Sequence, residues 1–214
     1  RGLAKGNPAH AYLFVGPPHV GKMAMAVNLA QALNCEAEER PCRQCSSCQR
    51  IAAGKHVDVQ TILLQEGETD GESKTKISVK QIEDLQHSSN LPPFEGNNKV
   101  FIIDQTEIFS SGAANRLLKT LEEPPPRVVF ILLTSDERRI PATIISRCRR
   151  IELLPMPADK IEEALFKELG IDPKKARLLA RLSRGCPGWA LTAALNDGIL
   201  QHRMELLEEL LTII

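Results

Sequence analysis

The sequence lacks an excess of either charge, a long apolar run and a secretory signal. Its 27 basic residues balance 27 acidic ones, so the 214 residues carry no net charge. Proteins that bind nucleic acid tightly usually have a basic excess, and this chain alone is therefore not expected to do so. The longest apolar run, VVFILL from Val128, is much shorter than the roughly 20 residues that span a bilayer.

The first residues, RGLAKGNPAHAYLF, are polar and do not begin with Met. They show no signal-peptide pattern, and we interpret the chain as a trimmed piece of a longer protein. Hydrophobic residues make up 43% of the chain, which is enough to bury a core. The length suits one large domain or two small ones.

The sequence does contain a cluster of cysteines. The clustered residues are Cys35, Cys42, Cys45 and Cys48, in the pattern C-x6-C-x2-C-x2-C. In a chain without a secretory signal, such clustering indicates metal binding rather than disulfides. Two residues between cysteines let both thiolates face one ion, and four thiolates make a closed tetrahedral zinc site. The pattern therefore predicts a structural zinc knuckle over residues 35–48.

Reduced thiols without a metal, an iron–sulfur cluster and a catalytic zinc ion are the alternatives for this cluster. The catalytic ion is the least favoured, because four sulfur ligands leave no open position for a substrate. Arg40, Arg43 and Arg50 lie close in sequence, where their charges can offset that of the thiolates. Cys148 and Cys186 are isolated and are interpreted as small apolar residues.

The stretch GPPHVGKM, residues 16–23, nearly matches the phosphate-binding pattern G-x-x-x-x-G-K-[ST]. Gly16, Gly21 and Lys22 fit the pattern, but Met23 replaces the hydroxyl residue. In such a loop backbone N–H groups surround phosphate oxygens, the lysine neutralises charge and the hydroxyl holds Mg²⁺. A thioether cannot replace that hydroxyl, because Mg²⁺ prefers hard oxygen ligands. An ATPase, a nucleotide binder without hydrolysis and a chance match are all open at this point.

Patterns of strands and helices alternate along the first 154 residues. Strands are expected at residues 10–16, 56–64, 97–104 and 127–135, and helices at residues 23–34, 78–90, 110–123 and 141–148. Ser78 is a plausible helix cap, and residues 65–76, without any apolar side chain, are expected to form a mobile exposed loop. The strand–loop–helix order around residues 16–23 makes a chance match improbable. Alternation of this kind predicts a parallel sheet covered by helices on both faces.

Only helices are expected after Leu154. The three helical segments are residues 157–170, 172–183 and 187–214. Pro155 and Pro157 mark a linker, so we place a domain boundary between residues 154 and 155.

Several motifs together resemble bacterial clamp-loader subunits of DNA polymerase III. HAYLFVGP, the four-cysteine knuckle, FIIDQTE, AANRLLKTLEEPPP and IPATIISRC follow one another in the order found in that family. The resemblance covers essentially the whole chain and is strongest to the delta-prime subunits, with the ATP-hydrolysing gamma/tau subunits next. It implies an α/β P-loop domain of the AAA+ type over residues 1–154, with the knuckle as an insertion. A three-helix lid over residues 155–214 would follow, and the family's helical collar is expected to be absent from this chain.

The same resemblance implies a degenerate nucleotide site. Its residues would be Gly16, Gly21, Lys22, Asp104 and Thr134. Active members have a hydroxyl where Met23 stands, a glutamate to orient the attacking water where Gln105 stands, and a lid arginine about where Trp189 stands. Glu107 is two residues further along the strand end and is expected to point elsewhere. Simpler roles remain open, namely Asp104 as a turn cap and Trp189 as part of the lid core.

Arg147, in Ser146-Arg147-Cys148, would be an arginine finger that acts in trans on ATP bound by the neighbouring subunit. A planar, permanently charged donor suits the charge that develops on the γ-phosphoryl group. The alternative is that Arg147 belongs, with Arg149 and Arg150, to a solvated basic helix end. Thr134 and Ser135 have the position of the family's first sensor, and their hydroxyls touch either phosphate or only backbone groups at the strand end.

The resemblance therefore implies a delta-prime-like, non-hydrolysing subunit of the bacterial clamp loader, which acts in DNA replication. The alternatives are an ATP-hydrolysing gamma/tau-type subunit and, disfavoured by the neutral charge, a zinc-dependent DNA-binding module. Expected cofactors are structural Zn²⁺ and weakly bound ATP or ADP. Expected partners are the gamma/tau and delta subunits and, through the complex, the sliding clamp and primed DNA, with no membrane. The protein is expected to be cytoplasmic, and this piece to be monomeric without its collar.

Overall fold

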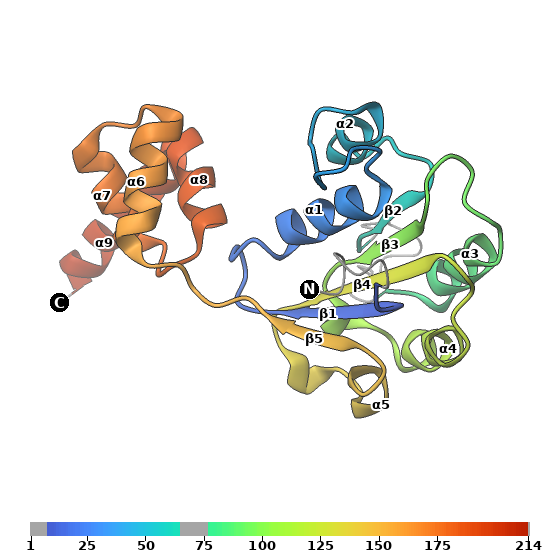
Figure 1. Ribbon diagram of the computed structural model, residues 1–214. Coiled ribbons are helices and arrows are strands. Elements are labelled where there is room, and N and C mark those ends of the chain that lie inside the picture. Colours follow the sequence, from blue (N-terminus) through green and yellow to red (C-terminus); the bar gives the residue numbers. More distant parts are fainter. Residues whose placement is uncertain (1–7, 65–76, 214) are drawn as a thin grey trace. The chain divides into compact units, whose positions relative to one another are not determined.

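The computed structural model describes residues 8–64 and 77–213 (Figure 1). The predicted loop at residues 65–76 lies outside this range. The chain divides into two compact units, of which the first comprises Arg1–Gly16 and Lys22–Glu152 and the second Pro17–Gly21 and Leu153–Ile214. In the described residues, no helix combines the length and the apolar character needed to cross a membrane.

A parallel sheet of five strands, in the order β2-β3-β4-β1-β5, forms the centre of the first unit. The strands are β1 (Ala11–Val15), β2 (Val59–Ile62), β3 (Lys99–Ile103), β4 (Val128–Thr134) and β5 (Arg149–Glu152). Every residue of the three central strands is buried. Burial on both faces is the property of a parallel sheet covered by helices, as predicted.

The first four strands were expected, but β5 was not. This strand contains Arg149 and Arg150, which one interpretation placed at a basic helix end. Arg149 is paired with Tyr12 of β1. That interpretation is wrong because the open edge of β1 supplies backbone partners to the segment. The sequence RRIE has one apolar residue, so it carries no strand pattern.

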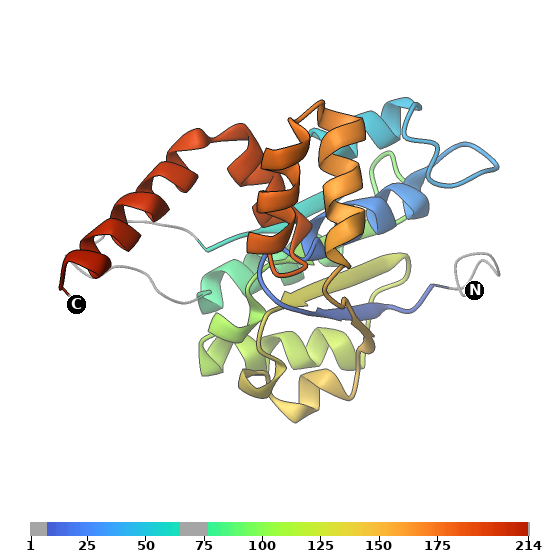
Figure 2. The ribbon, with the colours of Figure 1, turned by 90° about the vertical axis from the view of Figure 1, so that its left-hand side faces the viewer.

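Helices cover both faces of the sheet. They are α1 (Lys22–Asn34), α2 (Ser46–Ala52), α3 (Val79–Ser89), α4 (Ser111–Glu122) and α5 (Ala142–Ile145), with short 3₁₀ turns η2 (Thr106–Ile108) and η3 (Glu137–Arg139). Figures 1 and 2 show α1 on one side of the sheet and α4 and α5 on the other. Ser78 caps α3 as predicted, in a reciprocal capping box with Gln81.

The core of the first unit is formed by the apolar side chains between the sheet and the helices α3 and α4. Phe101 and Phe130 stack on adjacent strands with ring centroids 5.5 Å apart. Ile82 of α3 and Leu117 of α4 are fully buried in the same cluster. The ends of the strands are thereby held on a rigid layer.

The second unit contains, within the described residues, the helices α6 (Ala158–Leu169), α7 (Pro173–Leu182), α8 (Pro187–Leu195) and α9 (Asp197–Ile213). The third predicted helical segment thus forms two helices, because Asn196 has an extended backbone (φ −129°, ψ 95°). Ile161, Leu179 and Ala190 are buried in one cluster, against which the half-buried Trp189 packs. That packing supports the simpler role of Trp189 as part of the lid core.

Candidate functional site

The glycine loop lies between β1 and α1, in the strand–loop–helix order that the motif requires. Gly16 directly follows β1, and its N–H donates to the carbonyl of Thr134 at 3.2 Å. Gly21 has φ +106°, a region that favours glycine, and α1 begins at the next residue. The loop therefore starts beside the carboxyl end of β4, at the sheet edge where α/β proteins bind ligands.

The side chain of Lys22 is held at this edge. Its Nζ donates to the carbonyl of Gly16 at 2.7 Å and to Oγ of Ser135 at 3.0 Å, and the residue is only 8% exposed. A buried ammonium next to backbone N–H groups at a loop of this kind provides the charge that a phosphate requires. The structure thus brings Gly16, Lys22 and Ser135 together.

The two hydroxyl residues after β4 differ in what they contact. Thr134 is fully buried, and its Oγ1 accepts a hydrogen bond from the N–H of Asp136 at 3.1 Å. Ser135 is exposed and is the hydroxyl that reaches Lys22. The hydroxyl of Thr134 thus contacts only a backbone group at the strand end. The hydroxyl of Ser135 lies beside Lys22, as expected for a residue on the phosphate side.

The segment after β3 carries the acidic residues of the site. Asp104 accepts a hydrogen bond from the N–H of Gln105 at 2.9 Å through Oδ1, which is the turn-cap role left open by the sequence. Gln105 is exposed and has a left-handed backbone with φ +50°. Glu107 follows in η2, and its Oε1 accepts from the N–H of Ser135 at 3.3 Å.

The expectation that Glu107 points away from the site is wrong. Strand alternation ends at Asp104, because the left-handed Gln105 and the turn η2 redirect the chain toward β4. Thr106 fixes this turn by donating from Oγ1 to the carbonyl of Leu133 at 3.0 Å. The second carboxylate oxygen of Glu107, Oε2, is buried and has no hydrogen-bond partner in the described part of the chain.

Within the second unit, the loop contacts the start of α8. The N–H of Gly188 donates to the carbonyl of His19 at 2.9 Å. A Cβ at position 188 would lie 2.8 Å from that same oxygen, so the approach requires glycine. Trp189, which the resemblance would put near the position of a lid arginine, is therefore next to a backbone contact with the loop.

The four clustered cysteines lie together as predicted. Their sulfur atoms are all within 4.8 Å of one another, and Sγ of Cys42 is 4.0 Å from Sγ of Cys48. A tetrahedral site with Zn–S bonds of about 2.3 Å has its sulfurs about 3.8 Å apart, so the cluster fits a zinc ion with little movement. Hydrogen bonds from backbone N–H groups reach three of the sulfurs, on Cys35, Cys42 and Cys45. The N–H of Cys45 is the main cause that lowers the pKa of the Cys42 thiol, whereas burial raises the pKa of Cys48 to about 12.

The knuckle is anchored on the helix that begins at Lys22. Gln31 of α1 is buried and donates from Nε2 to the carbonyl of Cys48 at 2.8 Å. Arg43 donates to the side chain of Asn28 on the same helix at 3.1 Å. Arg50 forms an ion pair with Glu95 instead of contacting the cluster directly.

Arg147 directly follows Ser146, the C-cap of α5. Its Nη2 lies 2.7 Å from Oε1 of Glu122, at the end of α4, and its Nη1 donates to the carbonyl of Thr143 at 2.8 Å. The nearby Arg150 instead forms ion pairs with Glu137 and Glu152. Arg147 and Arg150 thus do not belong to one uniform basic surface.

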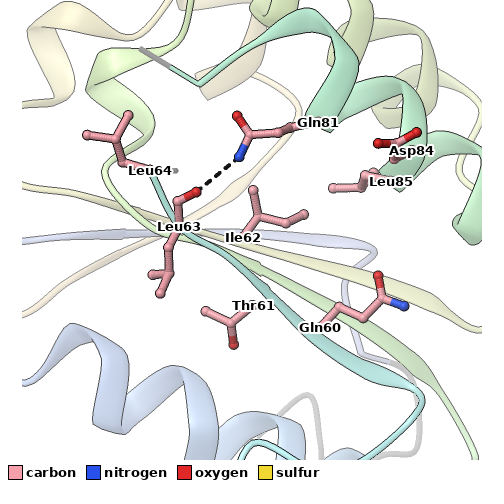
Figure 3. A pocket seen from close by; sticks show the side chains of 8 residues that line it. All are labelled: Gln60, Thr61, Ile62, Leu63, Leu64, Gln81, Asp84 and Leu85. Atoms are coloured by element: carbon pink, nitrogen blue, oxygen red, sulfur yellow. Dashed lines mark hydrogen bonds between the residues drawn. The ribbon is translucent and has the colours of Figure 1, made fainter. Parts of the chain in front are cut away.

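A pocket of about 340 Å³ lies at the open edge of the sheet, between β2 and α3 (Figure 3). Gln81 reaches across it, where its Nε2 donates to the carbonyl of Leu63 at 3.0 Å. None of the predicted site residues line this pocket. The glycine loop, where predicted site residues do come together, is therefore the better candidate for the functional site.

Comparison with known proteins identifies the family. Residues 1–157 match the family described as DNA polymerase III, delta subunit. The chain belongs to this family. The resemblance stated from the motifs is thereby confirmed.

Individual relatives carry the names of several subunits. DNA polymerase III subunit tau of Escherichia coli is 38% identical over 191 residues, 86% of this chain and 28% of that protein. Subunit gamma of Buchnera aphidicola is 37% identical over 212 residues, 96% of this chain and 55% of that protein. Subunit delta' of Bacillus subtilis is 33% identical over 207 residues, 96% of this chain and 60% of that protein. The chain thus spans from about a quarter to three fifths of the length of these curated relatives.

Solved structures confirm the predicted AAA+ fold class. A DNA polymerase III gamma subunit-related protein of Thermotoga maritima has a TM-score of 0.54 at 20% identity, over 85% of this chain and 64% of that chain. The RuvB Holliday junction branch migration motor of Thermotoga maritima has a TM-score of 0.56 at 14% identity, over 95% of this chain and 59% of that chain. These likenesses concern the fold alone.

Proposed function

We propose that this chain is the nucleotide-site part of a delta-prime-like clamp-loader subunit, which does not hydrolyse ATP itself. In this account it forms a P-loop domain over residues 1–154 and a lid over residues 155–214. It acts in DNA replication by supplying Arg147 in trans to ATP bound on a neighbouring subunit. Its partners are gamma/tau and delta subunits and, through the assembled complex, the sliding clamp and primed DNA.

The observation that carries this proposal is the residue that follows Lys22. The lysine is buried among loop and strand-end groups suited to a phosphate, yet Met23 offers no hydroxyl to Mg²⁺. Gln105 is neutral where the resemblance calls for a glutamate, and it is exposed on a left-handed turn. Such a site retains charge for binding ATP or ADP weakly but lacks two groups that phosphoryl transfer uses.

The proposed metal has a structural role. Four sulfurs leave no open position on a tetrahedral ion, so zinc at Cys35, Cys42, Cys45 and Cys48 would bind no substrate. Residues 35–48 include only the first turn of the short helix α2 and have few apolar side chains, so a metal would stabilise the fold of the knuckle.

ATP turnover by the full-length subunit tests the proposal. We expect turnover at background level, unchanged by Lys22→Ala, because each missing group typically lowers the rate about a hundredfold or more. Protein-bound nucleotide, measured by mass spectrometry after denaturation, reports binding separately from hydrolysis. Steady turnover that disappears with Lys22→Ala would contradict the non-hydrolysing assignment.

The second candidate is an ATP-hydrolysing gamma/tau-type subunit, and the position of Glu107 favours it. The carboxylate lies against Ser135, which in turn contacts Lys22, and one of its oxygens is unpaired within the described residues. A carboxylate near the phosphate site is the kind of group that orients an attacking water. In this case turnover would be measurable and would depend on both Lys22 and Glu107.

A further inference from the structure

The guanidinium of Arg147 is held by three residues. Nη2 lies 2.7 Å from Oε1 of Glu122, and Nη1 donates to the carbonyl of Thr143 at 2.8 Å and to Oγ of Ser146 at 3.3 Å. The side chain of Arg147 is about one third exposed, and that of Glu122 about one half. Arg147 is thus accessible at the surface while its orientation is fixed.

These contacts leave part of the guanidinium available. An arginine side chain has five N–H donors in a rigid planar fork. The three hydrogen bonds within the described chain use three of them. Two donors remain for the oxygens of a phosphate group that another subunit brings to this surface.

The three contacts differ in how rigidly they are supported. Thr143 and Ser146 belong to α5 and its cap, a helix of only four residues whose own stability is small. Glu122 is the last residue of α4, a helix of twelve residues anchored in the core by the buried Leu117 and Leu121. Ile144 buries α5 in the same core, so the contact with Glu122 adds a second and longer helix to the elements that hold Arg147.

We propose that Glu122 is a positioning residue for Arg147, an inference that rests on the proposed role of Arg147 in trans. The carboxylate orients the guanidinium before the partner's nucleotide arrives, so that less conformational entropy is lost when the phosphate binds. The hydrogen bond is charge-assisted, which makes it directional and stronger than a neutral one. Glu122 itself does not touch the nucleotide.

The experiment measures ATP hydrolysis by a clamp loader reconstituted from the full-length subunit, its partner subunits, the clamp and primed DNA. Glu122→Gln keeps the shape of the side chain and removes its charge. We expect kcat to fall about two- to fivefold with KM unchanged, as suits the loss of a partly exposed ion pair. The matched control is Glu123→Gln, a change at the next residue, which is exposed and makes no side-chain hydrogen bond within the described residues.

A double variant separates positioning from other effects. In an Arg147→Ala background, Glu122→Gln should cause no further loss, because there is no guanidinium left to orient. Full additivity, or a turnover raised by Glu122→Gln alone, would overturn the inference. If Arg147→Ala lowers turnover and Glu122→Gln does not, the inference fails and the proposed function stands. If Arg147→Ala has no effect, the proposed function fails, and the inference fails with it.

Discussion

The ammonium of Lys22 lies 3.0 Å from the hydroxyl of Ser135, so one hydrogen bond joins the start of α1 to the end of β4. The two residues are 113 positions apart in the sequence. The parallel sheet brings them together, because the carboxyl ends of β1 and β4 meet at the same edge. This contact defines the candidate nucleotide site more closely than the loop sequence does.

The first prediction concerns that contact. Lys22→Ala should weaken the binding of ATP or ADP to the full-length subunit at least about tenfold, because it removes the charge that faces the phosphates. Ser135→Ala should weaken it less, because Lys22 keeps its bond to the carbonyl of Gly16. Isothermal titration calorimetry measures both. A larger loss with Ser135→Ala than with Lys22→Ala would contradict this assignment, because it would make Ser135 the main phosphate contact.

The second prediction concerns the cysteine cluster. Protein prepared without chelator should contain about one zinc per chain, held by four thiolates as in other closed sites. Replacing Cys48 by Ser should release the metal, whereas Cys186→Ser, outside the cluster, should not. Elemental analysis measures the metal content. Protein without metal under these conditions would favour reduced thiols, and iron in place of zinc would favour a cluster.

The third prediction concerns Asp58, a fully buried residue next to β2. Burial alone would raise the pKa of its carboxyl group. The N–H groups of Phe94, Glu95 and Gly96 donate to it at 2.7–2.8 Å, and they hold the pKa below its usual range. Asp58→Asn should therefore lower the free energy of unfolding at neutral pH by about 1.5–3 kcal/mol.

The pH dependence of this effect follows from the lowered pKa. In the unfolded chain Asp58 titrates near its ordinary value of about 3.9, so its contribution is fully present above that pH. The contribution disappears as the pH falls through the lower value of the folded state. Urea unfolding at several pH values should thus show wild type and Asp58→Asn converging below about pH 4. A constant difference at all pH values would contradict the explanation.

The fold could be predicted largely because the three central strands are apolar and because Ser78 marks the start of α3. The β5 strand could not, since RRIE owes its conformation to pairing with β1 rather than to its own composition. The break between α8 and α9 was likewise missed, although Asn196, Asp197 and Gly198 are residues that favour turns over helices. The β5 strand depends on a tertiary pairing, whereas the break at Asn196 is local, because its Oδ1 accepts a hydrogen bond from the N–H of Gly198 at 3.1 Å.

The candidate site, like the fold, could be predicted from the sequence only in part. The glycine loop and the cysteine cluster are compact sequence patterns, and the structure assembles both near the expected places. The roles of Glu107 and Ser135 depend on the turn η2, where the left-handed Gln105 redirects the chain. The sequence gives little sign of this turn. A positive φ is uncommon for residues other than glycine, and glutamine is not among the residues that adopt it more often than the rest.

The fourth prediction distinguishes the two candidate functions through Glu107. If the subunit does not hydrolyse ATP, Glu107→Gln should leave turnover at background and should not alter turnover by the assembled clamp loader. If it is a gamma/tau-type ATPase, the same change should lower its own turnover by about a hundredfold or more. Measuring the isolated full-length subunit and the complex in parallel separates these outcomes.

The most direct test of the account is the rate of ATP hydrolysis by the reconstituted clamp loader with Arg147→Ala, compared with Arg149→Ala. An arginine finger contributes on the order of 10³-fold or more at its own site, and the visible loss is smaller because other sites keep their own arginines. We predict that Arg147→Ala clearly lowers the rate of hydrolysis and leaves assembly normal. Arg149→Ala should change the rate little, because Arg149 lies in β5. Equal losses that depend on salt would identify a DNA-facing basic surface, and no loss with either variant would contradict a role for Arg147 in trans.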